Sequence, residues 1–169
     1  MGKPIVALIP KKGAKDEGDM RPIALLPYVY RVWMCVRKAD IEEWASGMHG
    51  GKFKAAEALA WELASRGEAA RLCEEFFMAG LLDCSKCYER VGHKKAHDRA
   101  CQTGCSPTVV NLAVEMYGRH RIIQAHGAHS RPVKANRGML AGCGFAVHFL
   151  KAIISGILED VPVDTRDYV

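Results

Sequence analysis

An apolar segment that ends in a carboxylate constrains the fold of this chain more than any other feature. Residues 76–82 read Phe-Phe-Met-Ala-Gly-Leu-Leu and lead directly into Asp83. A short apolar run of this kind is typical of a buried strand. An ionised carboxylate that leaves such a strand is costly unless it faces solvent, a partner or a metal ion. The segment therefore predicts a buried strand whose terminal Asp83 is well placed to hold a divalent cation against a phosphate.

Length and composition are those of a globular domain or a substantial piece of one. The 169 residues are 49% hydrophobic and 25% charged, which excludes a disordered tail. No segment approaches the roughly 20 uninterrupted apolar residues that cross a bilayer, so we expect no membrane partner. Seven cysteines are an odd number, which favours reduced thiols in an intracellular compartment, nuclear or cytoplasmic.

Charge is distributed in blocks along the chain. Residues 1–38 carry eight Lys or Arg against three Asp or Glu, and residues 86–137 carry ten against three. The acidic block between them, residues 39–85, carries four against nine. Two basic blocks of this size can form a groove for nucleic-acid phosphates, although solvated surface explains them equally well.

Hydrophobic periodicity and turn residues predict a mixture of helices and strands. Extended segments are expected at residues 5–9, 22–26, 76–82 and 121–125. Helices are expected at residues 27–44, 52–75, 93–102, 107–118 and 145–158, with Ser106 as an N-cap and Pro107 in the first turn. Residues 11–20 and 138–144 are expected to be loops.

Four segments, taken in order, resemble the motifs of a reverse transcriptase of the non-LTR retrotransposon type. Two of them match a fingers motif written I-P-K and then R-P-I-x-L, and a third resembles the palm motif L-D-x-S-K-A-[FY]-D. The fourth resembles G-x-x-Q-G-C/S, and Tyr117 and Arg121 match a Tyr and an Arg that precede it. The four segments are residues 9–12 (Ile-Pro-Lys-Lys), 21–26 (Arg-Pro-Ile-Ala-Leu-Leu), 82–89 (Leu-Asp-Cys-Ser-Lys-Cys-Tyr-Glu) and 138–143 (Gly-Met-Leu-Ala-Gly-Cys).

The resemblance implies a fold and an activity. The fold would be α/β (α+β), the fingers and partial palm of a right-hand polymerase, helix-rich with a small incomplete antiparallel sheet. Residues 1–169 would be a single partial domain, fingers-like over 1–75 and palm-like over 76–169. The parent activity would be RNA-templated DNA synthesis, a nucleotidyl transfer that uses two Mg²⁺ ions, with Mn²⁺ as an alternative. The implied partners are an RNA template, a DNA primer and a dNTP, and the oligomeric state stays open.

The palm motif implies a catalytic and nucleotide-binding role for five positions. Asp83 would be the catalytic, metal-binding carboxylate, joined on the metal by the backbone carbonyl of Cys84. Lys86 and Cys87 would meet the incoming triphosphate through their main chain. Tyr88 would be the steric gate that excludes a 2′-hydroxyl.

The fingers and glycine motifs imply further nucleotide contacts. Arg21, with Lys11 or Lys12, would hold triphosphate oxygens, because a guanidinium offers a bidentate fork. Gly142 would let the backbone pass close to template and nucleotide, because it has no side chain.

The chain departs from the family pattern in three places. Ala141 stands where the family commonly has Gln, and Cys87 stands where it commonly has Ala. The sequence ends at Asp167-Tyr168-Val169, before the Asp pair of the family's Tyr-x-Asp-Asp hairpin. Since one carboxylate bridges two Mg²⁺ ions poorly, we expect the chain as given to be inactive or nearly so. The alternatives are a non-catalytic nucleic-acid-binding remnant and a metal-stabilised interaction module. Each residue taken alone also has a purely structural interpretation: Asp83 as an ordinary strand-end or N-cap residue, and Tyr88 as a core side chain.

Two cysteine patterns point to other chemistry. A Cys-x-x-Cys spacing at Cys84 and Cys87 is that of redox sites, but Asp83 opposes thiolate formation there. Histidine and cysteine also recur every four residues, at His93, His97, Cys101 and Cys105. Neighbours in this series share a helical face and could bind zinc, but one straight helix cannot wrap four ligands around a metal.

Overall fold

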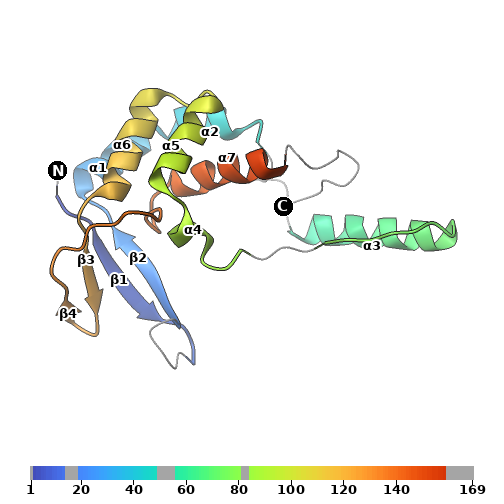
Figure 1. Cartoon of the computed structure of the whole chain (residues 1–169), viewed down its shortest axis with the longest axis horizontal. Coiled ribbons are helices and arrows are strands. Elements are labelled where there is room, and N and C mark those ends of the chain that lie inside the picture. The colour runs from blue at the N-terminus through green and yellow to red at the C-terminus, as the bar shows by residue number, and fades with distance from the viewer. Residues whose placement is uncertain (1, 14–18, 49–55, 81–83, 159–169) are drawn as a thin grey trace.

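The computed structural model describes residues 2–13, 19–48, 56–80 and 84–158, which form a small sheet, a helical layer and a projecting arm. The strands are β1 (Ile5–Pro10), β2 (Met20–Leu25), β3 (Ile122–Ala125) and β4 (Ala128–His129). The helices are α1 (Tyr28–Val36), α2 (Lys38–Ala45), α3 (Ala56–Leu72), α4 (Cys87–Arg90), α5 (His93–Gln102), α6 (Pro107–Gly118) and α7 (Ala146–Leu158). Figure 1 shows the sheet below the helical layer, with α3 extending away from both. Within the described residues, no helix combines the length and the apolar character that crossing a membrane requires.

The sheet has the strand order β2-β1-β3-β4 and is mixed, with both parallel and antiparallel strand pairs. β1 and β2 form an antiparallel hairpin in which Ile5 lies opposite Leu25. β3 runs parallel to β1, with Ile5 opposite Ile122. The antiparallel sheet expected from the resemblance is therefore wrong at this pair, although the coarser α+β class is confirmed. The physical reason is the long connection through α5 and α6, which returns the chain beside β1 in the same direction.

The core lies within the helical layer and against one side of the hairpin. Its largest buried side chains come from α1, α2, α6, α7 and the loop before α7: Tyr30, Ile41, Val110, Met116, Tyr117, Leu140, Phe145 and Phe149. Tyr117 meets Phe149 edge to face at 6.3 Å between ring centres, a favoured aromatic geometry. The hairpin contributes Val6 and Ala24, so the sheet and helices share one core.

A buried thiol satisfies the polar ends of two core tyrosines. The hydroxyl of Tyr117 donates to Cys143 Sγ at 3.2 Å, and the Tyr30 hydroxyl lies 3.5 Å from the same sulfur. The thiol in turn points to Met34 Sδ at 3.6 Å. Burial raises the pKa of both phenols, which keeps them protonated and able to donate. The thiol thus joins α1, α6 and the loop before α7.

Local signals place several helices correctly. α5 spans the predicted residues 93–102, and α6 begins at Pro107 and ends at Gly118 as predicted. The single helix predicted over residues 27–44 is wrong, because the chain forms α1 and α2 with a break at Arg37. Arg37 has φ −92° and ψ 8°, a turn conformation that lets α2 bring Ile41 into the core.

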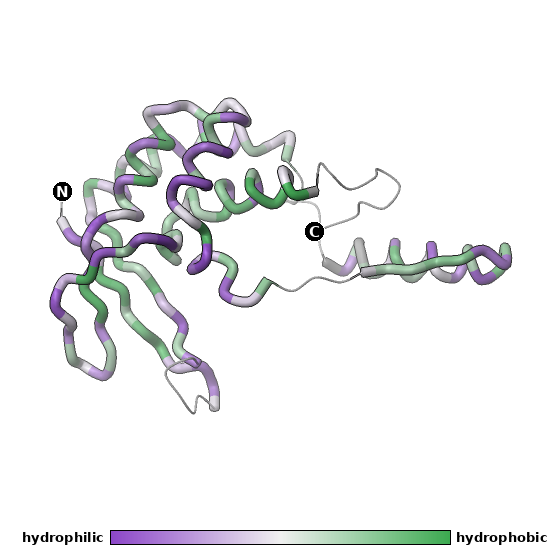
Figure 2. Tube along the Cα trace, viewed as in Figure 1, coloured by the Kyte–Doolittle hydropathy of each residue, from purple (hydrophilic) through white to green (hydrophobic). Residues whose placement is uncertain are grey.

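The apolar segment before Asp83 is the clearest difference from the sequence prediction. Over residues 76–80 it is neither a strand nor buried, while residues 81–83 lie outside the described part of the chain. Phe76 is 90% exposed and Met78 is 80% exposed. The segment runs back along α3 (Figure 2). The Phe77 ring lies against Gly67 of that helix. The segment is apolar enough for a buried strand, but no other segment covers it. Within the described residues it pairs with no strand, and α3 shields mainly Phe77.

Two phenylalanine substitutions distinguish the exposed arm from the core. Replacing Phe149, which is 1% exposed, by Ala should lower the free energy of unfolding by about 3–5 kcal/mol. The same change at Phe76 should alter it by no more than about 0.5 kcal/mol, because the ring already faces solvent. Urea unfolding followed by circular dichroism measures both. A Phe76→Ala loss as large as that of Phe149→Ala would show that residues 76–80 are buried after all.

Candidate functional site

A loop over residues 138–142 joins segments that are far apart in the sequence. The Gly138 amide donates to the Val91 carbonyl at 2.8 Å, and the Met139 amide donates to the Tyr88 carbonyl at 2.9 Å. On its other side the Ala24 amide of β2 donates to the Ala141 carbonyl at 2.7 Å. The loop over residues 138–142, the segment after Asp83 and the β1–β2 hairpin are therefore held together by main-chain hydrogen bonds.

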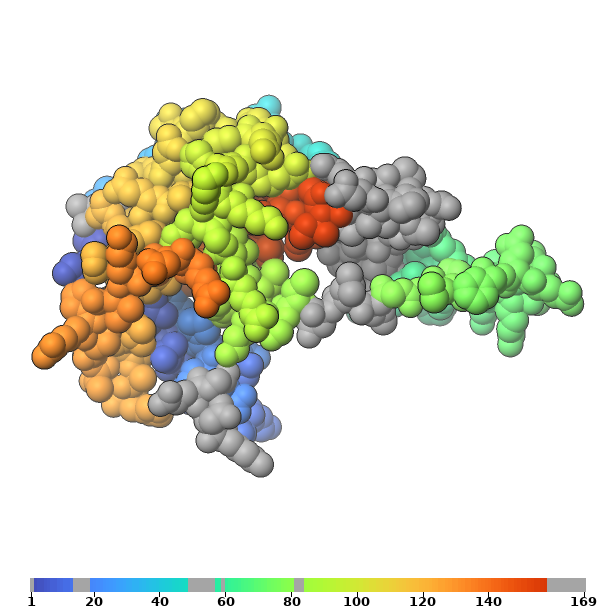
Figure 3. Space-filling view, viewed as in Figure 1, coloured from blue at the N-terminus to red at the C-terminus, as the bar shows by residue number. Residues whose placement is uncertain are grey.

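These three segments enclose a small cavity of about 70 Å³. In Figure 3 the yellow-green segment that leads into α5 meets the orange loop over the blue strands of the hairpin. The cavity is lined by residues of β1, β2 and α4, by the residue before β3 and by the loop: Val6, Pro22, Ala24, Glu89, Arg121 and residues 137–141. We take this cavity and its rim as the candidate site.

Two arginines bring positive charge to the cavity. Arg121 donates from Nη2 to the Tyr117 carbonyl at 2.7 Å, which fixes its guanidinium. Its Nε is buried and has no hydrogen-bond partner within the described structure. Burial lowers the pKa of Arg121, as expected for a desolvated cation. Arg137 is exposed, and Glu89 is a further charged residue of the lining. The arrangement suits a small anionic group that approaches from solvent.

Glycine is required at two positions of the loop. Gly142 has φ +104°, and a Cβ there would lie 3.0 Å from the Ala24 carbonyl oxygen. Gly138 has φ +91°, and a Cβ there would lie 3.0 Å from the Glu89 carbonyl oxygen. Because both neighbours are main chain, neither can rotate away from an added methyl group. Because Gly142 has no side chain, the backbone of the loop can lie directly against the backbone of β2.

The residues after Asp83 form a short turn and one helical turn. Lys86 caps α4 in the left-handed conformation with φ 51° and is exposed. Tyr88 is half-buried and packs on the core, and burial raises the pKa of its phenol. Burial also raises the pKa of the Cys87 thiol, helped by the nearby Cys84. A thiol with a raised pKa is a poor nucleophile precursor, which disfavours a redox role for this pair.

The structure does not bring Arg21, Lys11 or Lys12, the cations expected to hold the triphosphate, to the cavity. Side chains alternate between the faces of a strand, so Arg21 lies on the face opposite to Pro22 and Ala24, which line the cavity. Lys11 follows the end of β1, and at about 3.3 Å per residue it lies roughly 16 Å along the strand from Val6. Lys12 is one residue further. These three residues flank the hairpin rather than the cavity.

The expected metal site depends on Asp83, which lies outside the described residues. Cys84, whose carbonyl was expected to join it, is exposed. Elsewhere in the described part of the chain, no three or more His, Cys, Asp or Glu side chains gather in a way that could hold a metal ion. The donor chemistry of an Asp carboxylate and a main-chain carbonyl suits Mg²⁺, which prefers oxygen ligands.

Sequence reasoning missed three residues of the cavity: Glu89, Arg121 and Arg137 had no predicted role in nucleotide binding. Arg137 directly precedes the glycine motif, and Arg121 follows the Tyr117 that was matched to the family. These positions next to motif residues were the available sequence signal.

A larger hollow of about 690 Å³ lies between α5 and α7. It contains none of the motif residues, and we therefore place the candidate site at the smaller cavity.

Comparison with known proteins adds no family assignment. No family model matches the sequence, and no curated protein matches it.

Substituting Gly142 by Ala tests the close approach between the loop and β2. The left-handed backbone and the clash with Ala24 should together lower the free energy of unfolding by about 1–3 kcal/mol. Gly144→Ala is the matched control, because nothing lies within 4 Å of a Cβ at that position. Urea unfolding of both variants gives the comparison. Equal stabilities would contradict the tight contact between the loop and the hairpin.

Proposed function

We propose that this chain is the fingers and partial palm of a reverse transcriptase, which binds a template–primer duplex and a dNTP for RNA-templated DNA synthesis. One observation carries the proposal. Three segments that resemble separate polymerase motifs are joined by main-chain hydrogen bonds at 2.7–2.9 Å around one cavity. Their order in the sequence alone does not require this proximity, since Tyr88 and Met139 are far apart along the chain.

The charges at the cavity support an anionic ligand. Arg121 is held by its bond to the Tyr117 carbonyl, so its position is set before any ligand arrives. Arg137 is exposed and free to turn toward a phosphate at the rim. Arginine is well suited to this role because its planar fork matches two phosphate oxygens. In this proposal these two arginines contact phosphates at the cavity, and Arg21 contacts the nucleic acid from the other face of the hairpin.

In this proposal Tyr88 is the steric gate, and Gly142 supports the loop against β2 instead of contacting template or nucleotide. Tyr88 is anchored through its carbonyl to Met139 and through its ring to the core, as a fixed gate beside a sugar requires. The absence of a side chain at Gly142 keeps the loop against β2. Asp83 and the Cys84 carbonyl would hold Mg²⁺, or Mn²⁺, which when bound neutralises phosphate charge during nucleotidyl transfer.

The test is binding of a labelled RNA–DNA template–primer, followed by fluorescence anisotropy with and without dNTP and Mg²⁺. The assay follows binding and not DNA synthesis, because the motifs supply a single catalytic carboxylate, Asp83, and nucleotidyl transfer with two metal ions needs more than one. The complementary dNTP should tighten duplex binding in the presence of Mg²⁺, and Asp83→Asn should abolish this gain. A non-catalytic remnant would bind the duplex with no dNTP effect, and that result would contradict the proposal.

Arg137→Ala should weaken duplex binding about tenfold, the equivalent of losing one charge-assisted hydrogen bond. Arg71→Ala is the matched control, since Arg71 is an exposed arginine on the distant α3. The apparent affinity of wild type should also fall steeply as salt rises, because phosphate contacts release counterions. Equal losses in the two variants would show that net charge, and not the cavity, determines binding.

A further inference from the structure

A basic surface outside the candidate site extends from the β3–β4 hairpin along the segment that follows it. We call residues 126–134 the basic ridge. The ridge belongs to a stretch of the chain, residues 116–158, that contains six Lys or Arg and no Asp or Glu. Every residue of the ridge is exposed. In Figure 3 the ridge, in orange, projects from the left side of the molecule, and the chain continues from it to the loop beside the cavity.

Hydrogen bonds on both sides of Arg131 hold the ridge to the sheet. The Ser130 amide donates to the Ile123 carbonyl at 2.8 Å, and the Ile123 amide donates to Ser130 Oγ at 2.9 Å. Two residues beyond Arg131, Val133 exchanges two main-chain hydrogen bonds with Arg121, at 2.8 and 2.9 Å. The backbone of the ridge is therefore fixed before any ligand binds, which reduces the conformational entropy that binding costs.

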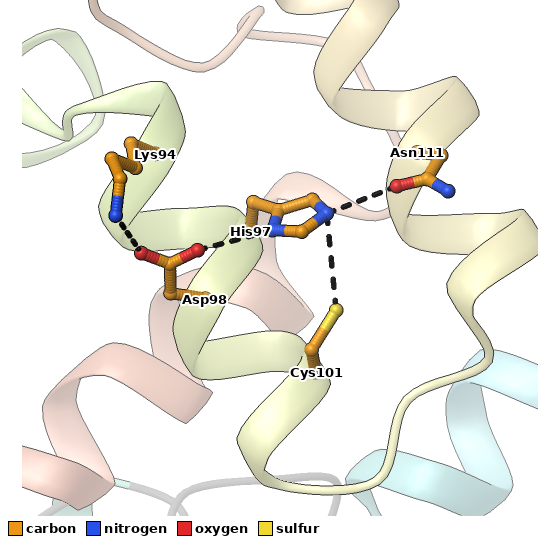
Figure 4. A network of polar contacts seen from close by, with 5 residues as sticks. All are labelled: Lys94, His97, Asp98, Cys101 and Asn111. Carbon is orange, nitrogen blue, oxygen red and sulfur yellow. Dashed lines mark hydrogen bonds and ion pairs between the residues drawn. The ribbon is translucent and has the colours of Figure 1, made fainter.

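The two cations of the ridge have no acidic partner. Neither Arg131 nor Lys134 forms an ion pair within the described residues. The two acids that precede the ridge in the sequence are paired with other bases. Glu115 of α6 accepts from Arg119 at 2.7 Å, and Asp98 accepts from a lysine of α5 at 2.7 Å (Figure 4). Positive charge that no acid of the protein balances attracts an anionic partner.

Two exposed histidine rings accompany these cations. His126 and Gly127 form the two-residue turn of the hairpin, and both have positive φ, 48° and 79°. His129 stands on β4, the edge strand of the sheet. A histidine ring can stack on an unpaired base, whereas the bases of a duplex are already stacked on one another. Rings and cations on one narrow edge therefore suit a single strand of nucleic acid better than a duplex.

We propose that the basic ridge binds single-stranded RNA, with Arg131 and Lys134 on its phosphates and His129 against a base. The chain leads from the ridge to the candidate site, because Arg137 lines the cavity. In the proposed function the strand is the unpaired template on its way to the cavity, and this assignment rests on that function. The phosphate contacts themselves need neither the cavity nor a metal ion.

Binding of a short labelled single-stranded RNA, followed by fluorescence anisotropy without dNTP or Mg²⁺, tests the ridge. Each phosphate contact on a single strand contributes about 0.7 to the slope of log affinity against log salt, or about fivefold in affinity at about 0.1 M salt. Arg131→Gln and Lys134→Gln should each weaken binding by this factor and make the slope shallower by about 0.7. Arg71→Gln is the matched control, because it removes an exposed arginine from α3, and it should change neither quantity.

Two variants of His129 separate stacking from charge. His129→Ala should weaken RNA binding about fivefold or more, the usual effect of losing one stacking ring. His129→Phe should retain the affinity, because a phenyl ring also stacks on a base. A duplex of the same sequence should bind the wild type more weakly than the single strand does, and His129→Ala should leave duplex binding unchanged.

Circular dichroism establishes that each variant is folded. Losses in Arg131→Gln and Lys134→Gln no larger than that in Arg71→Gln would overturn the ridge as a binding surface. Equal affinities of His129→Ala and wild type, or tighter binding of the duplex, would overturn its selection of a single strand. Tighter binding of single-stranded DNA of the same sequence would overturn the assignment to an RNA template. A missing dNTP effect on template–primer binding contradicts the polymerase proposal alone, because the ridge titrations contain no dNTP.

Discussion

The main-chain hydrogen bonds of residues 138–142 are the constraint on which the rest of the arrangement depends. Through them the loop fixes Tyr88 on one side and Ala24 on the other. They require glycine at 138 and 142, because the backbone is left-handed there and the neighbours are main-chain oxygens. The adjoining Cys143 continues the connection into the core through the hydroxyls of two tyrosines. The loop over residues 138–142 and the adjoining Cys143 therefore hold both the cavity and the hydrophobic core in place.

Sequence analysis correctly predicted the helices whose start, end or periodicity is set by nearby residues. Pro107 marks the start of α6, and periodicity bounds α5, so both helices appear where expected. The strand predicted over residues 76–82 is absent over residues 76–80, because an apolar run shows that burial is favourable but not whether another segment covers it. The same reasoning applies to the site. Tyr88 and Gly142 stand in recognisable motifs, whereas Arg121 and Arg137 gain their meaning from contacts between distant segments.

The helix pair α5 and α6 supports the candidate site from behind. On α5, His93 donates to the Gly138 carbonyl of the loop, and His97, four residues on, contacts Asn111 of α6. On α6, the Tyr117 carbonyl accepts from Arg121 and so fixes its guanidinium at the cavity. The position of both the loop and the arginine therefore depends on how these two helices pack.

The arm has a consequence for how this protein tolerates change. α3 and the segment that returns along it leave the body and come back without contributing the large side chains of the core. Lengthening or shortening α3 by whole turns would alter how far the arm reaches while the register of the sheet and the helix contacts stay the same. Substitutions on this arm, including at its exposed Trp61, should therefore be tolerated independently of the sheet and the helical layer.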